Sequence, residues 1–284
     1  MSKYDPTKVL TLEDLGDILG PFFRTSLGRV VGRLLFRVSG VDGVNAISGR
    51  HWELRHAAFA QAVLDDPDVQ VGYRIHGREN LDSMRAEKSF LTVSNHPFGG
   101  LDGLILVAII GQIRPDFKVL VNNFLTNITP LTDTWIPIQP RKNKKNYRHA
   151  PEKNISGLRM VAAQLAEGHP MGIFPAGGIA HYDWSKGAPK EQPWQMNSIR
   201  ILKRAEQPIY PVMFGGQNSR LFYLLSRLSY NLNLLRIPAE MLNKRGRTID
   251  VYIGEPIRPS ELEALPTLEA TRDYLMSRCL GLIK

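Results

Sequence analysis

The chain has 284 residues, and its 36 lysines and arginines exceed its 27 aspartates and glutamates, which gives a formal net charge of +9. Its single cysteine, Cys279, excludes an intrachain disulfide and gives no metal-binding pattern, so we expect no metal site. No apolar run reaches the roughly 18 to 20 residues that a membrane-spanning helix needs, and the first residues lack the build of a signal peptide.

The excess of positive charge predicts attraction to anionic membranes, acidic carrier proteins or nucleic acid. The sequence has no aromatic RNA-binding strand and no paired zinc ligands, so nucleic acid is not an expected partner. We therefore expect a peripheral protein that acts at the cytoplasmic face of an anionic membrane surface.

Residues 1–60 are expected to form a mostly helical extension, which glycines interrupt at 40–49. Within residues 22–38, apolar side chains recur at helical spacing among arginines. Such a helix suits the headgroup boundary of a membrane, but the same periodicity suits a helix that packs on the rest of the protein. Residues 221–232 are a second amphipathic candidate with the same two interpretations. The apolar positions of the first are Phe23, Leu27, Val30, Val31, Leu34 and Leu35.

Residues 61–284 are expected to form the second domain, with an α/β fold in which helices cover a mixed sheet. Short apolar runs rich in β-branched residues predict strands, and longer periodic segments predict helices. The expected strands lie at 69–76, 90–94, 117–121, 172–175, 209–213 and 249–253. The expected helices lie at 101–112, 151–167, 194–205 and 260–282.

A histidine and an aspartate flank the turn between the strand at 90–94 and the helix that follows it. The turn contains His96, Gly99, Gly100 and Asp102. A neutral imidazole held by a carboxylate can remove a proton from an alcohol, because the carboxylate fixes the tautomer and stabilises the imidazolium that forms. Alternatively, His96 caps the helix and Asp102 is a solvated carboxylate that complements the helix dipole.

The order of this motif and three others along residues 70–255 resembles the glycerolipid acyltransferases, the enzymes similar to lysophosphatidic acid acyltransferase. The resemblance implies that His96 and Asp102 are catalytic, with His96 taking the proton of the acceptor hydroxyl and Asp102 holding it. Five residues separate the two here, one more than in the usual motif of the family. That spacing is most similar to the branch that acylates ornithine lipids and other aminolipids, and the two glycines can absorb the extra residue.

Residues 135–141 resemble the second motif of the family, a strand that ends in a basic residue near the polar head of the acceptor. The resemblance implies that Arg141 binds this head. Four more basic residues follow between 142 and 148, which suits the phosphates of coenzyme A, an acidic carrier protein or an anionic lipid surface. Taken one at a time, the lysines of this run indicate a solvated basic loop, and only Arg141 gains from its position in the motif.

The third motif departs from the family pattern. The family has a glutamate that helps to hold the acceptor, where this chain has Ala176. Relatives with alanine at that position carry a glutamate two residues later, where this chain has Gly178. The motif therefore lacks its carboxylate, although the resemblance still implies that its other residues bind substrate. These are Phe174, Pro175, Gly177 and Gly178, and the polar residues nearby that could supply the missing contact are His181, Asp183, Ser185 and Lys186.

Residues 208–214 fit the fourth motif, an apolar strand that contains a proline, and the resemblance implies that Pro211 binds substrate. The continuation through Asn218, Ser219 and Arg220 also resembles the aminolipid branch.

Taken together, the resemblance implies an O-acyltransferase of membrane lipid synthesis. It would move a fatty acyl group from acyl-CoA or acyl carrier protein to a hydroxyl of a lyso-lipid, either a lyso-aminolipid or lysophosphatidic acid. Because no serine or cysteine lies in a nucleophile motif, we expect direct transfer without an acyl-enzyme. The thioester is a co-substrate, and no resident cofactor is expected. The alternatives are a non-catalytic protein that binds lipid or carrier, and an acyl-thioester hydrolase.

Overall fold

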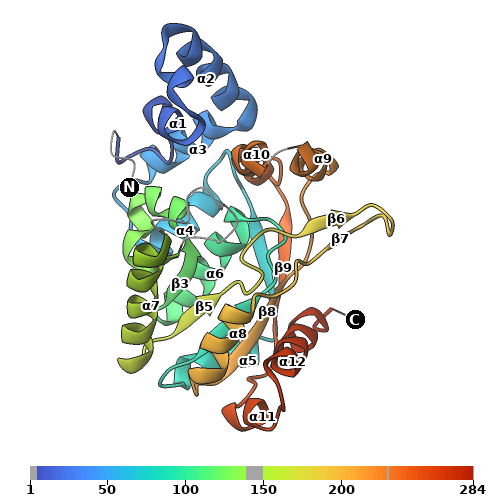
Figure 1. Ribbon diagram of the computed structural model, residues 1–284. Helices are drawn as coiled ribbons and strands as arrows, with labels where there is room; N and C mark the ends of the chain where they lie inside the picture. The colour runs from blue at the N-terminus through green and yellow to red at the C-terminus, as the bar shows by residue number, and fades with distance from the viewer. Residues whose placement is uncertain (1–4, 139–149, 229, 284) are drawn as a thin grey trace.

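The computed structural model describes residues 5–138, 150–228 and 230–283. A seven-stranded sheet lies at its centre, in the order β1-β9-β8-β2-β5-β3-β4 (Figure 1). All neighbouring strands of this sheet are parallel except β8 and β9. The mixed sheet that the sequence predicted is therefore confirmed. The strands are β1 (Gly72–His76), β2 (Leu91–Ser94), β3 (Lys118–Asn122), β4 (Trp135–Ile138), β5 (Met171–Ile173), β8 (Ile209–Phe214) and β9 (Thr248–Ile253).

Helices cover both faces of the sheet, so its inner strands β2, β3, β5 and β8 are mostly buried. In β3, Val119 and Val121 belong to one apolar cluster and Leu120 to the other, as the alternation of side chains in a strand requires. The helices that pack in the first cluster are α4 (His56–Asp65), α5 (Arg78–Ala86) and α6 (Gly100–Ile113). Those of the second are α7 (Ala150–Ala166), α8 (Met196–Arg204), α11 (Pro259–Glu263) and α12 (Leu268–Leu280).

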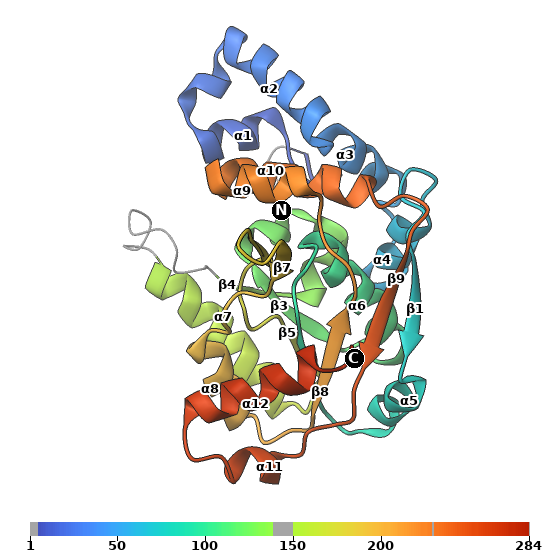
Figure 2. The ribbon, with the colours of Figure 1, turned by 90° about the vertical axis from the view of Figure 1, so that its right-hand side faces the viewer.

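The remaining helices lie at one end of the molecule (Figure 2). This is the end at which β2, β3, β4, β5 and β8, which all run in one direction, have their carboxyl ends. There α10 contacts α2, α3, α6 and α9. An antiparallel hairpin of β6 and β7 projects beside α9 (Figure 1). The elements are α1 (Leu12–Leu19), α2 (Ser26–Ser39), α3 (Val41–Arg50), α9 (Arg220–Leu228), α10 (Tyr230–Leu242), β6 (His181–Asp183) and β7 (Ala188–Lys190). Three short 3₁₀ helices complete the described chain: η1 (Pro21–Arg24), η2 (Asn123–Asn127) and η3 (Thr129–Thr134).

Three sequence expectations need comment. The glycine-rich interruption at 40–49 is wrong, because α3 runs through it and only Gly40, with φ 78°, separates α2 from α3. The helix expected at 260–282 is two helices, since Pro266 lies between α11 and α12. The boundary expected after residue 60 falls inside α4, and the division into two domains stays a prediction. None of the described helices is long and apolar enough to cross a membrane.

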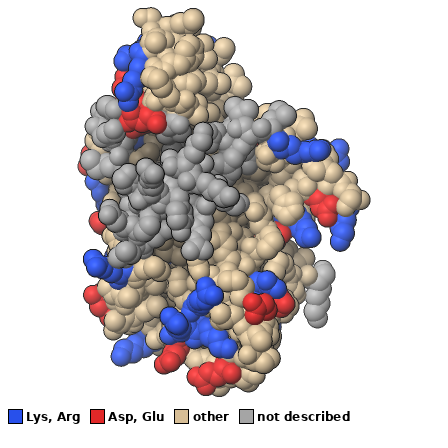
Figure 3. Space-filling model, in the orientation of Figure 1, with Lys and Arg blue, Asp and Glu red and all other residues tan. Residues whose placement is uncertain are grey.

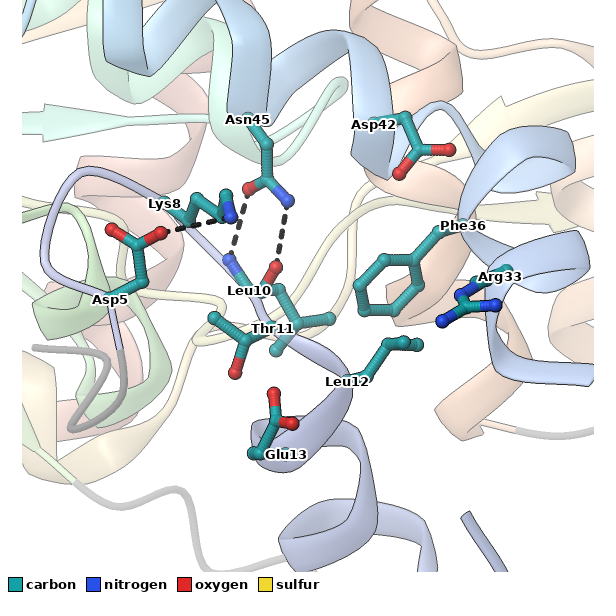
Figure 4. A pocket seen from close by; sticks show the side chains of 10 residues that line it. All are labelled: Asp5, Lys8, Leu10, Thr11, Leu12, Glu13, Arg33, Phe36, Asp42 and Asn45. Carbon is teal, nitrogen blue, oxygen red and sulfur yellow. Dashed lines mark hydrogen bonds and ion pairs between the residues drawn. The ribbon is translucent and has the colours of Figure 1, made fainter. Parts of the chain in front are cut away.

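A cavity of about 570 Å³ opens between the first described residues and helices α2 and α3 (Figure 4). Several polar groups in its wall are paired within the chain. Asn45 accepts a hydrogen bond from the backbone N–H of Leu10 and donates one to its carbonyl, at 3.2 and 2.7 Å, and Lys8 pairs with Asp5 at 2.9 Å. The cavity wall therefore fastens the N-terminal segment to α3, and it contains no residue of the four motifs.

Candidate active site

Three of the four motifs meet at the carboxyl edge of the parallel strands. His96 follows β2, the third motif follows β5, and residues 215–220 follow β8. Because β2 pairs with both β5 and β8, the segments that follow these strands are neighbours, and the carboxyl edge is where ligands bind in open α/β sheets. Arg141 and the basic run at 142–148 lie outside the described residues.

The side chains of His96 and Asp102 are paired. Nδ1 of His96 lies 3.1 Å from Oδ2 of Asp102, which is fully buried. The same oxygen accepts hydrogen bonds from the backbone N–H groups of Phe98 and Gly99, and Oδ1 accepts one from Gly103. Asp102 thus accepts from the N–H groups at the start of α6 and also holds the imidazole. The alternative interpretation is therefore wrong, because Asp102 is buried and not solvated, and Asp102 rather than His96 caps the helix. With Nδ1 engaged, Nε2 is the atom that can accept a proton.

Gly99 lies in the turn between His96 and Asp102. Its φ of 93° lies in the left-handed region, and a Cβ there would meet Cδ1 of Ile179 at 2.7 Å. The turn therefore requires glycine both for its backbone conformation and for its close packing.

Two asparagines that sequence reasoning did not assign to the site fasten the turn. The amide of Asn95 donates to the carbonyl of Phe214 at 3.0 Å and accepts from its N–H at 2.8 Å, which continues the pairing of β2 with β8 through a side chain. Asn218 donates to the carbonyl of Phe98 at 3.2 Å. The segment after the fourth motif therefore supports the turn of the first.

That segment is itself held by a buried carboxylate on α10. Glu240 accepts hydrogen bonds from the backbone N–H and the hydroxyl of Ser219, at 2.8 and 2.6 Å. Lys244 lies 3.4 Å from the same carboxylate. Burial raises the pKa of Glu240, but the hydrogen bonds from Ser219, with those of Asn243 and the charge of Lys244, outweigh it, so the pKa is lowered overall. Glu240 is therefore a charged anchor for this segment.

The third motif forms the wall beside the imidazole. The ring of Phe174 lies 4.5 Å from that of His96, centroid to centroid. Gly177 has φ 62°, and a Cβ there would meet the side chain of Gln195 at 2.2 Å. The carbonyl of Pro175 accepts from the N–H of Gln195 at 2.8 Å. Phe174 thus contacts the ring of His96, while Pro175 and Gly177 shape the loop that carries Phe174.

Two further predicted substrate contacts are placed but not tested. Gly178 follows in the same loop and is partly exposed. Pro211 is buried within β8 beside Val93, below the end of the strand. Their contacts with substrate stay predictions.

A carboxylate that sequence reasoning did not assign to the site reaches the turn from beyond the hairpin. Oε2 of Glu191, the residue after β7, accepts a hydrogen bond from the backbone N–H of His96 at 3.3 Å. Asp183, by contrast, accepts from Ser185 and from the N–H of Lys186 within the exposed hairpin. This placement is not readable from the sequence, because nothing in the pattern of residues 179–191 predicts the hairpin that brings Glu191 back.

The two ionisable groups nearest the turn have shifted pKa values. Burial lowers the pKa of His96, but the charge and hydrogen bond of Asp102 and the charge of Glu191 outweigh it, so the pKa is raised above its ordinary 6.5. Burial raises the pKa of Glu191 to about 7, against the opposing effects of the His96 N–H and charge. A histidine with these neighbours can act as a base near neutral pH.

Two other kinds of chemistry would require a metal centre or a reactive cysteine among the described residues. No group of three or more histidine, cysteine, aspartate or glutamate side chains in the described ranges could hold a metal ion. Cys279 is buried, and burial raises its pKa to about 12, which makes it a poor nucleophile.

Several known proteins are similar to this chain. A family model described as "Acyltransferase" matches residues 20–282. Two curated relatives are both named lyso-glycine lipid O-acyltransferase. The relative from Bacteroides thetaiotaomicron is 30% identical over 223 residues, 76% of each chain. The relative from Phocaeicola vulgatus is 31% identical over 206 residues, which are 70% of this chain and 68% of the relative.

A solved structure is also similar, that of the 1-acyl-sn-glycerophosphate (LPA) acyltransferase from Thermotoga maritima. It is 15% identical, its TM-score is 0.44, and the match covers 88% of this chain and 91% of that one.

The family match extends over far more than half of the chain, and its residues include all four motifs. The predicted resemblance to the glycerolipid acyltransferases is thereby confirmed. The chain belongs to this acyltransferase family and is an acyltransferase.

Proposed function

We propose that the chain transfers a fatty acyl group from an acyl thioester, of coenzyme A or of acyl carrier protein, to the hydroxyl of a lyso-aminolipid such as a lyso-glycine lipid. The observation that carries the proposal is the pairing of His96 Nδ1 with the buried carboxylate of Asp102 in a chain of this family. The printed names of the two curated relatives support the choice of acceptor. Lysophosphatidic acid is the alternative acceptor.

The proposed transfer is a single displacement. Nε2 of His96 takes the proton of the acceptor hydroxyl while its oxygen attacks the thioester carbonyl. The carbon–sulfur bond then breaks, and the leaving thiolate takes the proton from the imidazolium. The products are an ester and a free thiol, and neither a metal nor a resident cofactor takes part. Asp102 keeps Nδ1 protonated and stabilises the imidazolium between the two proton transfers.

The remaining motif residues have proposed binding roles. Phe174 packs against the ring of His96, so it is suited to contact the reacting part of the substrate. Gly177, Gly178 and Pro211 would complete the wall around the acceptor. We propose that Arg141 binds the anionic head of the lipid, on the strength of its position in the second motif.

An exposed apolar face at one end of the molecule supports docking on a membrane. On α2, Leu27, Val30, Leu34 and Val38 are each 59–66% exposed, although the helix packs on its neighbours through Gly28, Gly32 and Phe36. On α9, which contacts α10 as α2 does, Leu221 and Leu224 are about half exposed. Figure 3 shows mostly uncharged residues over the N-terminal helices, with charged side chains along one side. We propose that this end rests on an anionic membrane at its cytoplasmic face.

Mass spectrometry of lipids tests the proposal. The purified protein is incubated with acyl-CoA or acyl carrier protein and with lyso-glycine lipid, lyso-ornithine lipid or lysophosphatidic acid. We expect a diacylated product from a lyso-aminolipid, and its loss in His96→Ala. A matched control is His169→Ala, because His169 also pairs with an aspartate, Asp116, at 2.8 Å, but at the start of β5, away from the motifs.

Other outcomes would contradict the proposal. Thioester cleavage that is independent of any acceptor would indicate a hydrolase. Binding to lipid vesicles without turnover would indicate a non-catalytic protein. Product that persists in His96→Ala would remove His96 as the base.

A further inference from the structure

The segment that returns from the hairpin packs along the third motif. We call residues 191–195 the return segment. The side chain of Gln192 donates to the carbonyl of Ile179 at 2.7 Å, and that of Gln195 donates to the carbonyl of Ala176 at 3.0 Å. The return segment and the third motif therefore form one unit at the edge of the site.

This unit holds the main chain of His96 at both of its polar groups. The N–H of Ala180 donates to the carbonyl of His96 at 2.9 Å. Oε2 of Glu191 accepts from the N–H of His96 at 3.3 Å. The position of the imidazole thus depends on Asp102 through its ring and on Glu191 through its backbone.

The buried carboxylate of Glu191 lowers the stability of the fold. Its other oxygen, Oε1, is buried and has no hydrogen-bond partner of good geometry among the described residues. The indole N–H of Trp194, in the same segment, is also buried without such a partner. The indole still lowers the pKa of Glu191 somewhat, which indicates that the two lie close together. Burying a carboxylate with an unsatisfied oxygen destabilises a fold, so a neutral side chain would serve better if the position were only structural.

The charged groups around Glu191 indicate what its charge can do. The ionisable groups that act on its pKa are His96 from the turn and Asp102 from α6. Glu191 in turn helps to raise the pKa of Tyr223 on α9 and of Cys279 on α12, both raised chiefly by burial. Among these described neighbours, His96 is the group that can carry a positive charge, and it acquires that charge when it takes a proton.

We propose that Glu191 is a positioning residue for the acyl transfer: its carboxylate holds the backbone of His96 and stabilises the imidazolium that forms during the reaction. This role rests on the proposed function, because it requires His96 to take up a proton during turnover.

The test combines a titration with kinetics. The pKa of His96 is measured by NMR in the wild type and in Glu191→Gln, with its ring resonances identified by their absence from His96→Ala. Glutamine can still accept from the N–H of His96, so this variant removes the charge and keeps the shape. We expect the pKa of His96 to fall by about 1 unit, as for removal of an opposite charge at close range. Glu263→Gln, at an exposed position on α11, is the matched control and should leave the pKa unchanged.

Kinetics separate a positioning role from contact with the acceptor. In Glu191→Gln we expect kcat to fall about tenfold, with KM for the acceptor within about threefold of the wild type, and the acid limb of the pH profile to move to lower pH. An unchanged pKa of His96 would overturn the proposal, as would a loss confined to KM. A lowered pKa of His96 in a protein without transferase activity would overturn the proposed function and still support the coupling of Glu191 to His96.

Discussion

Oδ2 of Asp102 lies 3.1 Å from Nδ1 of His96 although the two residues are six positions apart, on either side of a turn. The carboxylate also accepts hydrogen bonds from three backbone N–H groups of that turn and of α6. One buried side chain therefore fixes the turn, the start of the helix and the orientation of the base.

Removing either member of this pair should abolish most of the activity. We expect His96→Ala and Asp102→Asn each to lower kcat by about 10²- to 10⁴-fold, the usual contribution of a general base. In the asparagine variant the amide cannot stabilise the imidazolium. Circular dichroism should show both variants folded, and steady-state assays with acyl thioester and lyso-lipid measure the loss. A variant that retains more than about a tenth of the wild-type kcat would contradict the assigned role.

The pH dependence of activity follows from the raised pKa of His96. The base must be neutral to take the proton of the hydroxyl, and Asp102 and Glu191 hold its pKa above 6.5 against the effect of burial. We therefore expect kcat/KM to rise with pH and to reach half of its maximum above pH 6.5. The measurement is a pH profile of kcat/KM at constant ionic strength. A midpoint below 6.5 would show that burial outweighs the two carboxylates.

The turn itself can be tested at two glycines of the same motif. Gly99→Ala places a side chain at φ 93° and against Ile179, so we expect a loss of about 1–3 kcal/mol in the free energy of unfolding together with a lower kcat. Gly103→Ala is the matched control. It lies within α6 and a Cβ there meets nothing within 4 Å, so it should be neutral or stabilising. Equal effects in chemical denaturation would argue against a special conformation at Gly99.

Much of the fold could be predicted because buried helices and strands have recognisable patterns of apolar residues in the sequence. The runs around β2 and β8 are apolar since both faces of the sheet are covered, and α6 is apolar almost all round because it is buried. The hairpin of β6 and β7 has no such apolar pattern, since its strands have three residues each and are partly or fully exposed. The single helix predicted at 260–282 is inconsistent with Pro266, because a proline inside a helical segment ends or kinks the helix.

The site could be predicted only where the residues that act together also lie close together in the sequence. His96 and Asp102 are close in sequence, and a resemblance to known motifs singled them out. Asn218 and Glu191 reach the turn from 120 and 95 positions away through tertiary packing. Their side chains are common surface types, so their roles follow from the structure and not from a local pattern.

The exposed apolar face of α2 gives a prediction about membranes. A charge in place of Leu27 and Leu34, each more than 60% exposed, should leave the fold intact and weaken binding to anionic vesicles by about tenfold or more, because both aliphatic side chains would leave the acyl region. Vesicle cosedimentation of the Leu27→Glu, Leu34→Glu double variant measures this. Leu158→Glu, at a similarly exposed leucine on α7, provides a control for added negative charge. Equal losses of vesicle binding in the two variants would show that the protein is attracted to the membrane by its charge alone.

The free energy of unfolding should show how much the buried carboxylate of Glu191 destabilises the protein. Because burial raises its pKa from 4.5 to about 7, its contribution to stability is fully present below pH 4.5 and is lost as the pH rises through 7, where the buried group ionises. Glu191→Gln avoids this loss. We expect the variant to match the wild type at pH 4.5 and to exceed it at pH 8 by about 1–3 kcal/mol in the free energy of unfolding, while its kcat is lower. Urea denaturation at the two pH values measures the difference. A variant less stable than the wild type at pH 8 would show that the carboxylate is kept for the fold, and a more stable but slower one that it is kept for catalysis.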